Sequence, residues 1–407
     1  MSSEQGHLLT TYQAMMEIIQ AEQEERVPIL ERADLRGADL HYVDLSGGDI
    51  READLADADL RGAYLCGAYL SKANLGGADL RGANLSKANL IEVNLGGATL
   101  RGAKLCGADL RSTNLCGVNL SGADLQGAYL IQANLIDVDL SGADLSHADL
   151  SGANLSGANF SGADLSGANL SSALLKGANL SKVNLTGARL TGANATMANL
   201  DRANMAGANL NLANLGGASM HGAHLCNASL AGANLAEADL SFSNLSNAIL
   251  RRTHLFCARL IKADLSKAEL CFANLNRADL SEANLSRSDL TRASLSFTNL
   301  SNASLLSANL TKVVLHYTQL TGAMLAGITL TGAKLQDIQA TEAEFADVDS
   351  NALAGITIDD LSAKQIGMFA RIQLIHDKQS SGILGKFVTE KTEIADLSGK
   401  NGVFERI

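Results

Sequence analysis

The sequence repeats every five residues over most of its length, and this repeat limits the folds that it can adopt. From Leu35 to Phe345 every fifth residue is apolar, which gives 63 such positions, of which 56 are Leu. The exceptions are Ile50, Phe160, Ala195, Met205, Met220, Ala340 and Phe345. The frame never slips, so no inserted loop interrupts it. A period of five fits neither a long strand nor a helix, whose periods are 2 and 3.6.

Each repeat unit combines a short extended side with a corner. Ala usually lies two positions before the central Leu, and Asp or Asn lies between them, as in Ala143-Asp144-Leu145. In extended backbone the Ala and the Leu point to one side and the Asp or Asn to the other. The Ser-Gly pair that often follows must turn the chain, since Gly tolerates the angles of a corner. The pattern predicts a solenoid with Leu and Ala inside and coils joined by backbone hydrogen bonds.

This consensus, Ala-(Asp/Asn)-Leu-Ser-Gly, resembles the A-(D/N)-L-x-x repeat of the pentapeptide-repeat family over about residues 31–349. The uninterrupted, Leu-centred form is similar in style to the long cyanobacterial members. The resemblance implies an all-β solenoid, a right-handed quadrilateral β-helix with twenty residues per coil. Residues 33–347 would then form about sixteen coils, a rod of roughly 75 Å at the ~4.8 Å spacing of adjacent strands.

The N-terminal segment, residues 1–30, is expected to form a helical cap, because the end of a solenoid leaves backbone groups unpaired. Pro28 would end this helix before the first coil. Within residues 7–25 the spacing of apolar residues predicts one apolar helical face, made of Leu8, Leu9, Tyr12, Met15, Met16 and Ile19.

The C-terminal segment, residues 350–407, follows the point where the repeat fades. Asp359 and Asp360 suit the start of a helix, which would run to about residue 376 and precede a loosely ordered tail, residues 378–407. Its apolar residues are Leu361, Ile366, Met368, Phe369, Ile372 and Ile375. The segment is either a second cap or a dimerisation element, and its large apolar content favours a homodimer.

No set of catalytic residues stands out, so we expect a protein that is not an enzyme and needs no cofactor. The nearest approach to a metal site is His221, His224 and Cys226, but the two histidines fall on opposite sides of a corner without an adjacent carboxylate. The six cysteines form no Cys-x-x-Cys pair and are expected to be free thiols in a reducing cytoplasm. No signal segment and no membrane span are predicted.

The net charge of −11 is concentrated in the first 150 residues. This acidity disfavours direct binding of nucleic acid, which requires a basic face. Because residues twenty apart would stack, Asp124, Asp144 and Asp164 form an acidic ladder within a stretch, between Arg111 and Lys176, that has no Lys or Arg. Stacked like charges are unfavourable, so the ladder is a candidate binding surface. The alternative is that Asp simply substitutes for Asn in the repeat.

A second column contains Arg252, Phe272, Arg292 and Lys312, and is a candidate surface for a protein partner. Exposed aromatic residues mixed with Arg are typical of interfaces, although local packing over the corners is an equal alternative. Further outward aromatic residues in this part of the rod are Phe242, Phe256, Phe297 and Tyr317. A third column is interpreted as a structural amide ladder of Asn74, Asn94, Asn114, Asn134 and Asn154.

Two functions are compatible with such a rod. The first is a regulatory scaffold that binds an unknown protein partner through its outer surface. The second is a DNA mimic that inhibits or protects a type II topoisomerase (DNA gyrase), as the resemblance to quinolone-resistance members of the family implies. The acidic N-terminal half fits this second function. Those relatives, however, commonly have Phe at the centres and some depend on loops, whereas this chain has Leu and no loop, so the scaffold is favoured.

Overall fold

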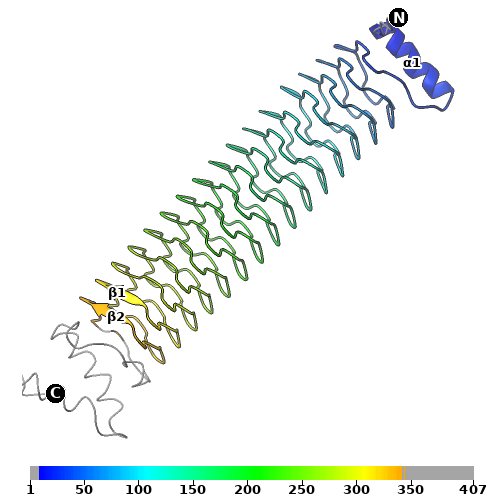
Figure 1. Ribbon diagram of the computed structural model, residues 1–407. Helices are drawn as coiled ribbons and strands as arrows, with labels where there is room; N and C mark the ends of the chain where they lie inside the picture. Colours follow the sequence, from blue (N-terminus) through cyan, green and yellow to red (C-terminus); the bar gives the residue numbers. More distant parts are fainter. Residues whose placement is uncertain (1–8, 342, 344–407) are drawn as a thin grey trace, which may run out of the picture.

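The computed structural model describes residues 9–341 and 343, and it shows a straight stack of similar coils with one helix at its N-terminal end (Figure 1). The helix α1 spans Thr11–Gln23. The strands β1, Val314–His316, and β2, Lys334–Gln336, lie side by side near the other end and pair in parallel. Along the rest of the rod the coils are joined by parallel bridges of single residues.

The bridges show that one coil contains twenty residues. Asp124 pairs with Asp144, which pairs with Asp164, and the same offset holds from Ile29 to Gln339. A two-residue turn follows every three-residue side, so each coil has four sides and four corners. The sides are too short to count as regular strands, which explains why only β1 and β2 extend to three paired residues. The period of five therefore corresponds to one side and one corner.

A single unit shows how the backbone N–H groups are satisfied. The N–H of Asp124 donates to the preceding coil at 3.0 Å, and those of Leu125 and Gly127 donate to the following coil at 2.6 and 2.9 Å. The N–H of Ala128 donates within the corner, to the Leu125 carbonyl, at 3.0 Å. The remaining N–H, that of Gln126, donates to Asp124 Oδ1 at 3.1 Å. The outward Asp or Asn therefore completes the hydrogen bonding of the unit, as buried backbone groups require.

The interior of the rod is a continuous core of Leu and Ala. Leu185 and Val183 are fully buried, as are nearly all the equivalent residues of the other units. Ala195, which replaces a central Leu, is also buried, and its N–H donates to the next coil at 2.7 Å like that of a Leu. Each buried Leu contributes roughly 1.5–3 kcal/mol, so stability is spread evenly along the rod rather than placed in one centre.

The helix α1 packs against the first coils, but with a different face from the one that the sequence predicted. Its buried residues are Ala14, Ile18 and Ala21, whereas Tyr12, Met16 and Ile19 are exposed, Tyr12 to 75%. The small alanines allow the helix backbone to approach the coil closely, which the larger residues would prevent. The predicted face was therefore wrong for Tyr12, Met16 and Ile19, while Leu9 and Met15 do pack against the core.

The ends of α1 are fixed by local hydrogen bonds. Thr10 and Gln13 form a reciprocal capping box at its start, so the helix begins at Thr11 rather than at residue 7. Glu17, within α1, holds the segment that follows the helix. It pairs with Arg26 at 2.6 Å and accepts the Ile29 N–H at 2.9 Å. Ile29 already bridges to the next coil, so the stack of coils begins slightly before residue 31. The predicted C-terminal helix, tail and dimerisation element all lie outside the described residues.

Replacing Leu185 by Asp should prevent folding, because the change places an unpaired charge among stacked leucines. Thermal unfolding followed by circular dichroism measures this. Lys182→Asp is the matched control, since it puts the same carboxylate on an exposed corner of the same coil, where Asp57 and Asp137 show that Asp is accepted. A Leu185→Asp protein that melts within a few degrees of the parent would contradict the continuous core.

Gly127→Val should destabilise the rod by roughly 1–2 kcal/mol, because a β-branched residue is strained at positive φ. The φ of Gly127 is +63°, and a Cβ atom there would meet nothing within 4 Å, so the backbone angle alone decides the cost. Gly127→Asn should cost less, since Asn227 and Asn247 hold similar angles elsewhere. Equal unfolding free energies for the two variants, measured in denaturant, would contradict this.

Candidate functional site

The three carboxylates of the predicted acidic ladder stack directly on one another. Asp124, Asp144 and Asp164 are paired in register and half-buried. Each accepts, through Oδ1, the N–H two residues later, at 3.1, 2.9 and 2.8 Å. Asn184 continues the column and accepts the same bond from Thr186 at 3.2 Å. In this geometry Asp does what Asn does, so the corner hydrogen bond accounts for the ladder without a partner.

Amide groups extend these columns by hydrogen bonds between coils. Asn184 Nδ2 donates to Asp164 Oδ1 at 3.0 Å. In the predicted amide ladder, Asn94 donates to Asn74 at 2.8 Å and Asn134 donates to Asn114 at 3.0 Å. The amide column thus has the structural role that the sequence indicated, although its ladder is formed from separate pairs.

Acidic residues nearer the N-terminus are neutralised by arginines. Asp59 is bound by Arg61 through two hydrogen bonds, Nη2 to Oδ2 at 2.5 Å and Nε to Oδ1 at 2.8 Å. The hydrogen bond from the Arg61 side chain lowers the pKa of Asp59 to about 2. An arginine two residues later binds the carboxylate in the same way at Asp34, Asp49, Asp79 and Asp109. Much of the N-terminal acidity is therefore paired on the surface.

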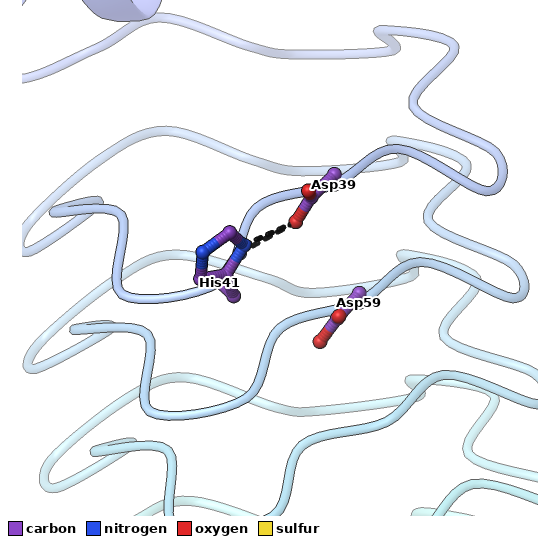
Figure 2. Close-up of side chains that lie close together, drawn as sticks. All are labelled: Asp39, His41 and Asp59. Atoms are coloured by element: carbon purple, nitrogen blue, oxygen red, sulfur yellow. Dashed lines mark hydrogen bonds and ion pairs between the residues drawn. The ribbon is translucent and has the colours of Figure 1, made fainter.

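Asp39, His41 and Asp59 form a cluster that the sequence reasoning missed (Figure 2). One ligand atom from each lies within 4.8 Å of the others. His41 Nδ1 contacts Asp39 Oδ1, and this hydrogen bond lowers the pKa of Asp39. Asp39 and Asp59 are twenty residues apart, so the coil period could have revealed the cluster. Because Arg61 holds both oxygens of Asp59, a metal ion would have to displace that arginine.

His221, His224 and Cys226, the nearest approach to a metal site in the sequence, do not form a metal-binding cluster in the described structure. His221 packs against the Phe242 ring, with centroids 5.1 Å apart, while His224 occupies a side position between Asn204 and Asn244. All six cysteines are free. Cys271 Sγ lies 2.9 Å from Asp289 Oδ2, and burial followed by this contact raises the pKa of the thiol to about 11. That thiol is therefore protonated and a poor nucleophile at neutral pH.

The second predicted column forms a ladder of alternating cations and an aromatic ring. Arg252, Phe272, Arg292 and Lys312 occupy equivalent corners, all with positive φ. The guanidinium carbons of Arg252 and Arg292 lie 5.8 and 5.4 Å from the Phe272 centroid, one from each neighbouring coil. All four residues are exposed. Cation–π contacts of this kind fix the side chains outside the core.

A parallel ladder on the next corner was only partly anticipated. Arg277 lies between two rings, 5.9 Å from Phe256 and 5.7 Å from Phe297. Phe297 also stacks on Tyr317, with centroids 4.9 Å apart and an interplanar angle of 12°. The aromatic residues were recognised as outward facing in the sequence, but Arg277 was not. Numbers twenty apart on the neighbouring corner, 257, 277, 297 and 317, are the signal that identifies it.

The fold and these surfaces define a β-helix solenoid whose side chains of interest lie on the outside of the coils. The family model described as pentapeptide repeats matches this sequence in successive stretches from residue 29 to residue 325. This covers more than half of the chain, and the chain belongs to the pentapeptide-repeat family.

Solved structures with similar coils come from the same family. HetL, a regulator of heterocyst differentiation from the cyanobacterium Nostoc sp. strain PCC 7120, is 32% identical over 63% of this chain and 95% of its own, with a TM-score of 0.29. A second Nostoc PCC 7120 protein, alr5209, is 39% identical over 26% of this chain and 84% of its own, with a TM-score of 0.24. QnrB1, a plasmid-mediated fluoroquinolone resistance protein, is 18% identical over 61% of this chain and 90% of its own, with a TM-score of 0.20. No curated protein matches the sequence.

Within residues 9–341, no helix has the length and apolar character needed to cross a membrane.

The Asp59 carboxyl should titrate near pH 2 and move toward its ordinary pKa of about 4 in Arg61→Gln. A pKa lowered by folding adds stability above the unfolded value, and this is lost as pH falls from about 4 to 2. The stability difference between the parent and Arg61→Gln should therefore shrink over that range. Carboxyl-carbon NMR and acid melts measure both effects. Arg101→Gln is the control, because the residue two positions before Arg101 is Thr99 and not an Asp. If Arg61→Gln left the pKa of Asp59 unchanged, the pairing of Arg61 with Asp59 would be contradicted.

Proposed function

We propose that this rod is a non-enzymatic protein-interaction scaffold with a regulatory role, built as a right-handed quadrilateral β-helix. The observation that supports it is the ladder of Arg252, Phe272, Arg292 and Lys312, whose members are exposed and held in place by neighbouring coils. A rigid surface loses little entropy on binding, and Arg and aromatic residues contribute most to interface energy. The partner is a protein, in a cytoplasmic setting.

The ends of the rod complete this proposal. The N-terminal segment, residues 1–30, acts as a cap, and residues 31–349 form the repeat body. The C-terminal segment, residues 350–407, caps the other end or joins two copies. Its apolar sequence supports the second role, which would present two binding surfaces to the same partner and raise avidity.

The alternative function is that of a DNA mimic directed at DNA gyrase. It is supported by Asp124, Asp144 and Asp164, which stack without an intervening Lys or Arg. Two observations weigh against it. The Oδ1 atoms of the ladder already serve the corners, and acids nearer the N-terminus, such as Asp59, are paired with arginines. The acidic surface is therefore less continuous than the sequence suggests.

The double variant Arg292→Glu with Phe272→Asn should abolish capture of the partner from native lysate and leave the melting temperature nearly unchanged. Glu and Asn both occupy other corners with positive φ, for example Glu282 and Asn302, so these changes suit the backbone. The matched test of the alternative is Asp144→Asn with Asp164→Asn, which removes the charges and keeps the corner hydrogen bonds.

A gyrase supercoiling assay beside the capture experiment separates the two functions. The scaffold predicts that the acidic double variant still captures its partner and that neither variant affects gyrase. If the parent rod inhibits or protects gyrase and only the Asp→Asn pair loses that effect, the DNA mimic is the correct function. Partner capture that survives Arg292→Glu with Phe272→Asn would show that the interface lies elsewhere on the rod.

A further inference from the structure

One side of the rod carries no acidic residue over four consecutive coils. This acid-free face consists of residues 252–257, 272–277, 292–297 and 312–317, whose sequences are RTHLFC, FANLNR, RASLSF and KVVLHY. One of its edges is the ladder of Arg252, Phe272, Arg292 and Lys312, and the other is the ladder that contains Arg277. The two ladders are therefore the borders of one surface rather than two separate features.

The cations of this face are available to a ligand. Nearby basic residues form ion pairs. Arg251, which shares the corner of Arg252, pairs with Glu269 at 2.7 Å, and Lys262, at a different corner, pairs with Glu282 at 3.3 Å. Among the residues that the structure describes, no such pair involves the cations of the face, which are Arg252, Arg277, Arg292 and Lys312. All four are exposed, so their charge is not cancelled locally.

Two acids on the adjoining sides, Asp289 and Asp279, form hydrogen bonds within their own part of the fold. Asp289 accepts the Thr291 N–H at 3.0 Å and contacts the Cys271 thiol. Asp279 accepts the Ser281 N–H at 3.0 Å. These bonds hold the carboxylates against their own corners and keep them from turning toward the face.

The backbone of this region is unusual for the chain. Most corners elsewhere have Gly at the position of positive φ, but seventeen consecutive corners from Glu237 to Tyr317 have none. Each non-Gly residue there adopts a left-handed conformation that Gly adopts without strain. The fold does not require this choice, since Gly serves all four equivalent corners at Gly152, Gly157, Gly162 and Gly167. Strain concentrated in one region points to a use for the side chains.

The contacts within the ladders cover the faces of Phe272 and Phe297, while the N–H groups of the arginines can still bind a ligand. Phe272 has a guanidinium on each side, and Phe297 lies between Arg277 and Tyr317. The Arg side chains lie beside the rings with guanidinium carbons 5.4–5.9 Å from the centroids. Each guanidinium has five N–H donors, so it can bind a carboxylate through two hydrogen bonds. The covered rings, in contrast, offer few free faces on which nucleic-acid bases could stack.

We propose that the acid-free face binds an extended acidic segment of a protein partner. The proposal rests on the scaffold function and adds the chemistry of the partner. Carboxylates of the segment pair with Arg252, Arg277, Arg292 and Lys312, while its aliphatic groups pack on the exposed ring edges. Equivalent corners two coils apart, such as those of Arg252 and Arg292, are about 10 Å from each other, which an extended segment spans in about three residues. A polypeptide is favoured over nucleic acid because Phe272 and Phe297 already have a neighbour on each side, which leaves few ring faces for bases.

Fluorescence anisotropy with the full chain tests this inference. The probe is a fluorescein-labelled peptide of Glu with interspersed Leu, and the comparison probe has Gln in place of Glu. We expect the Glu peptide to bind at least ~10-fold more tightly, and the affinity to fall with added salt. Arg277→Glu with Arg292→Glu should weaken binding at least ~10-fold, as expected for central Arg contacts.

The control variant is Lys182→Glu with Arg202→Glu, which makes the same change in net charge at exposed corners outside the face. This control pair should weaken binding by less than about threefold, because exposed charges that do not contact the peptide act on it only weakly through solvent. Arg277→Gln with Arg292→Gln provides a second test should the Glu pair disturb folding, since Gln132 occupies such a corner.

Four results would overturn the proposal. Equal losses in the control pair would show that net charge alone attracts the peptide. Equal affinity for the Gln peptide would show that carboxylates are not recognised. Tighter binding of oligo-dT, lost in the Arg277→Glu and Arg292→Glu pair, would assign the face to single-stranded nucleic acid. If the lysate partner is captured equally by this pair and the parent, the scaffold function stands and only the assignment of the face fails.

Discussion

Most units of the rod share one hydrogen bond, from the backbone N–H of the first corner residue to the side-chain oxygen of the Asp or Asn two positions earlier. The other four N–H groups of a unit find carbonyls in the same corner or in adjacent coils, as in Asp124 to Ala128. Units with Tyr129 or His224 at that position form the same coils without this bond. Where Asp or Asn is present, its oxygen satisfies a corner N–H inside the protein, and this contribution is repeated along the rod.

This constraint separates the residues that the fold selects from those that it leaves free. Asp and Asn both supply the oxygen, so the fold is indifferent to the charge at that position and Asp144 needs no functional explanation. The second corner residue is different, because positive φ favours Gly and no contact requires a larger side chain. Phe272 and Arg292 at such corners are therefore more informative about function than the acidic column, even though charge is the more conspicuous feature of the sequence.

The coil architecture was predictable because the frame never slips. An offset of twenty residues then places each member of the Arg252 column without further information, as the backbone pairing confirms for these coils. The face of α1 was not predictable from its spacing, since two small residues, Ala14 and Ala21, pack where larger ones were expected. Asp39 with Asp59, and Arg277 with Phe297, were not predicted, although the period of twenty residues places each pair on adjacent coils. Whether any of these residues meets a partner depends on that partner's chemistry.

Because every coil has twenty residues, the residue number fixes the direction in which a side chain points around the long axis of the rod. Adding twenty residues would lengthen it by one coil and leave every surface pointing in its former direction. Adding five residues between α1 and Arg252 would instead rotate everything beyond the insertion by a quarter turn about the long axis. Adding a single residue would bring corner side chains into the core. The direction in which the acid-free face points, relative to α1, is therefore set by the number of units between them, so unit count can reorient a binding surface in evolution without any change to its residues.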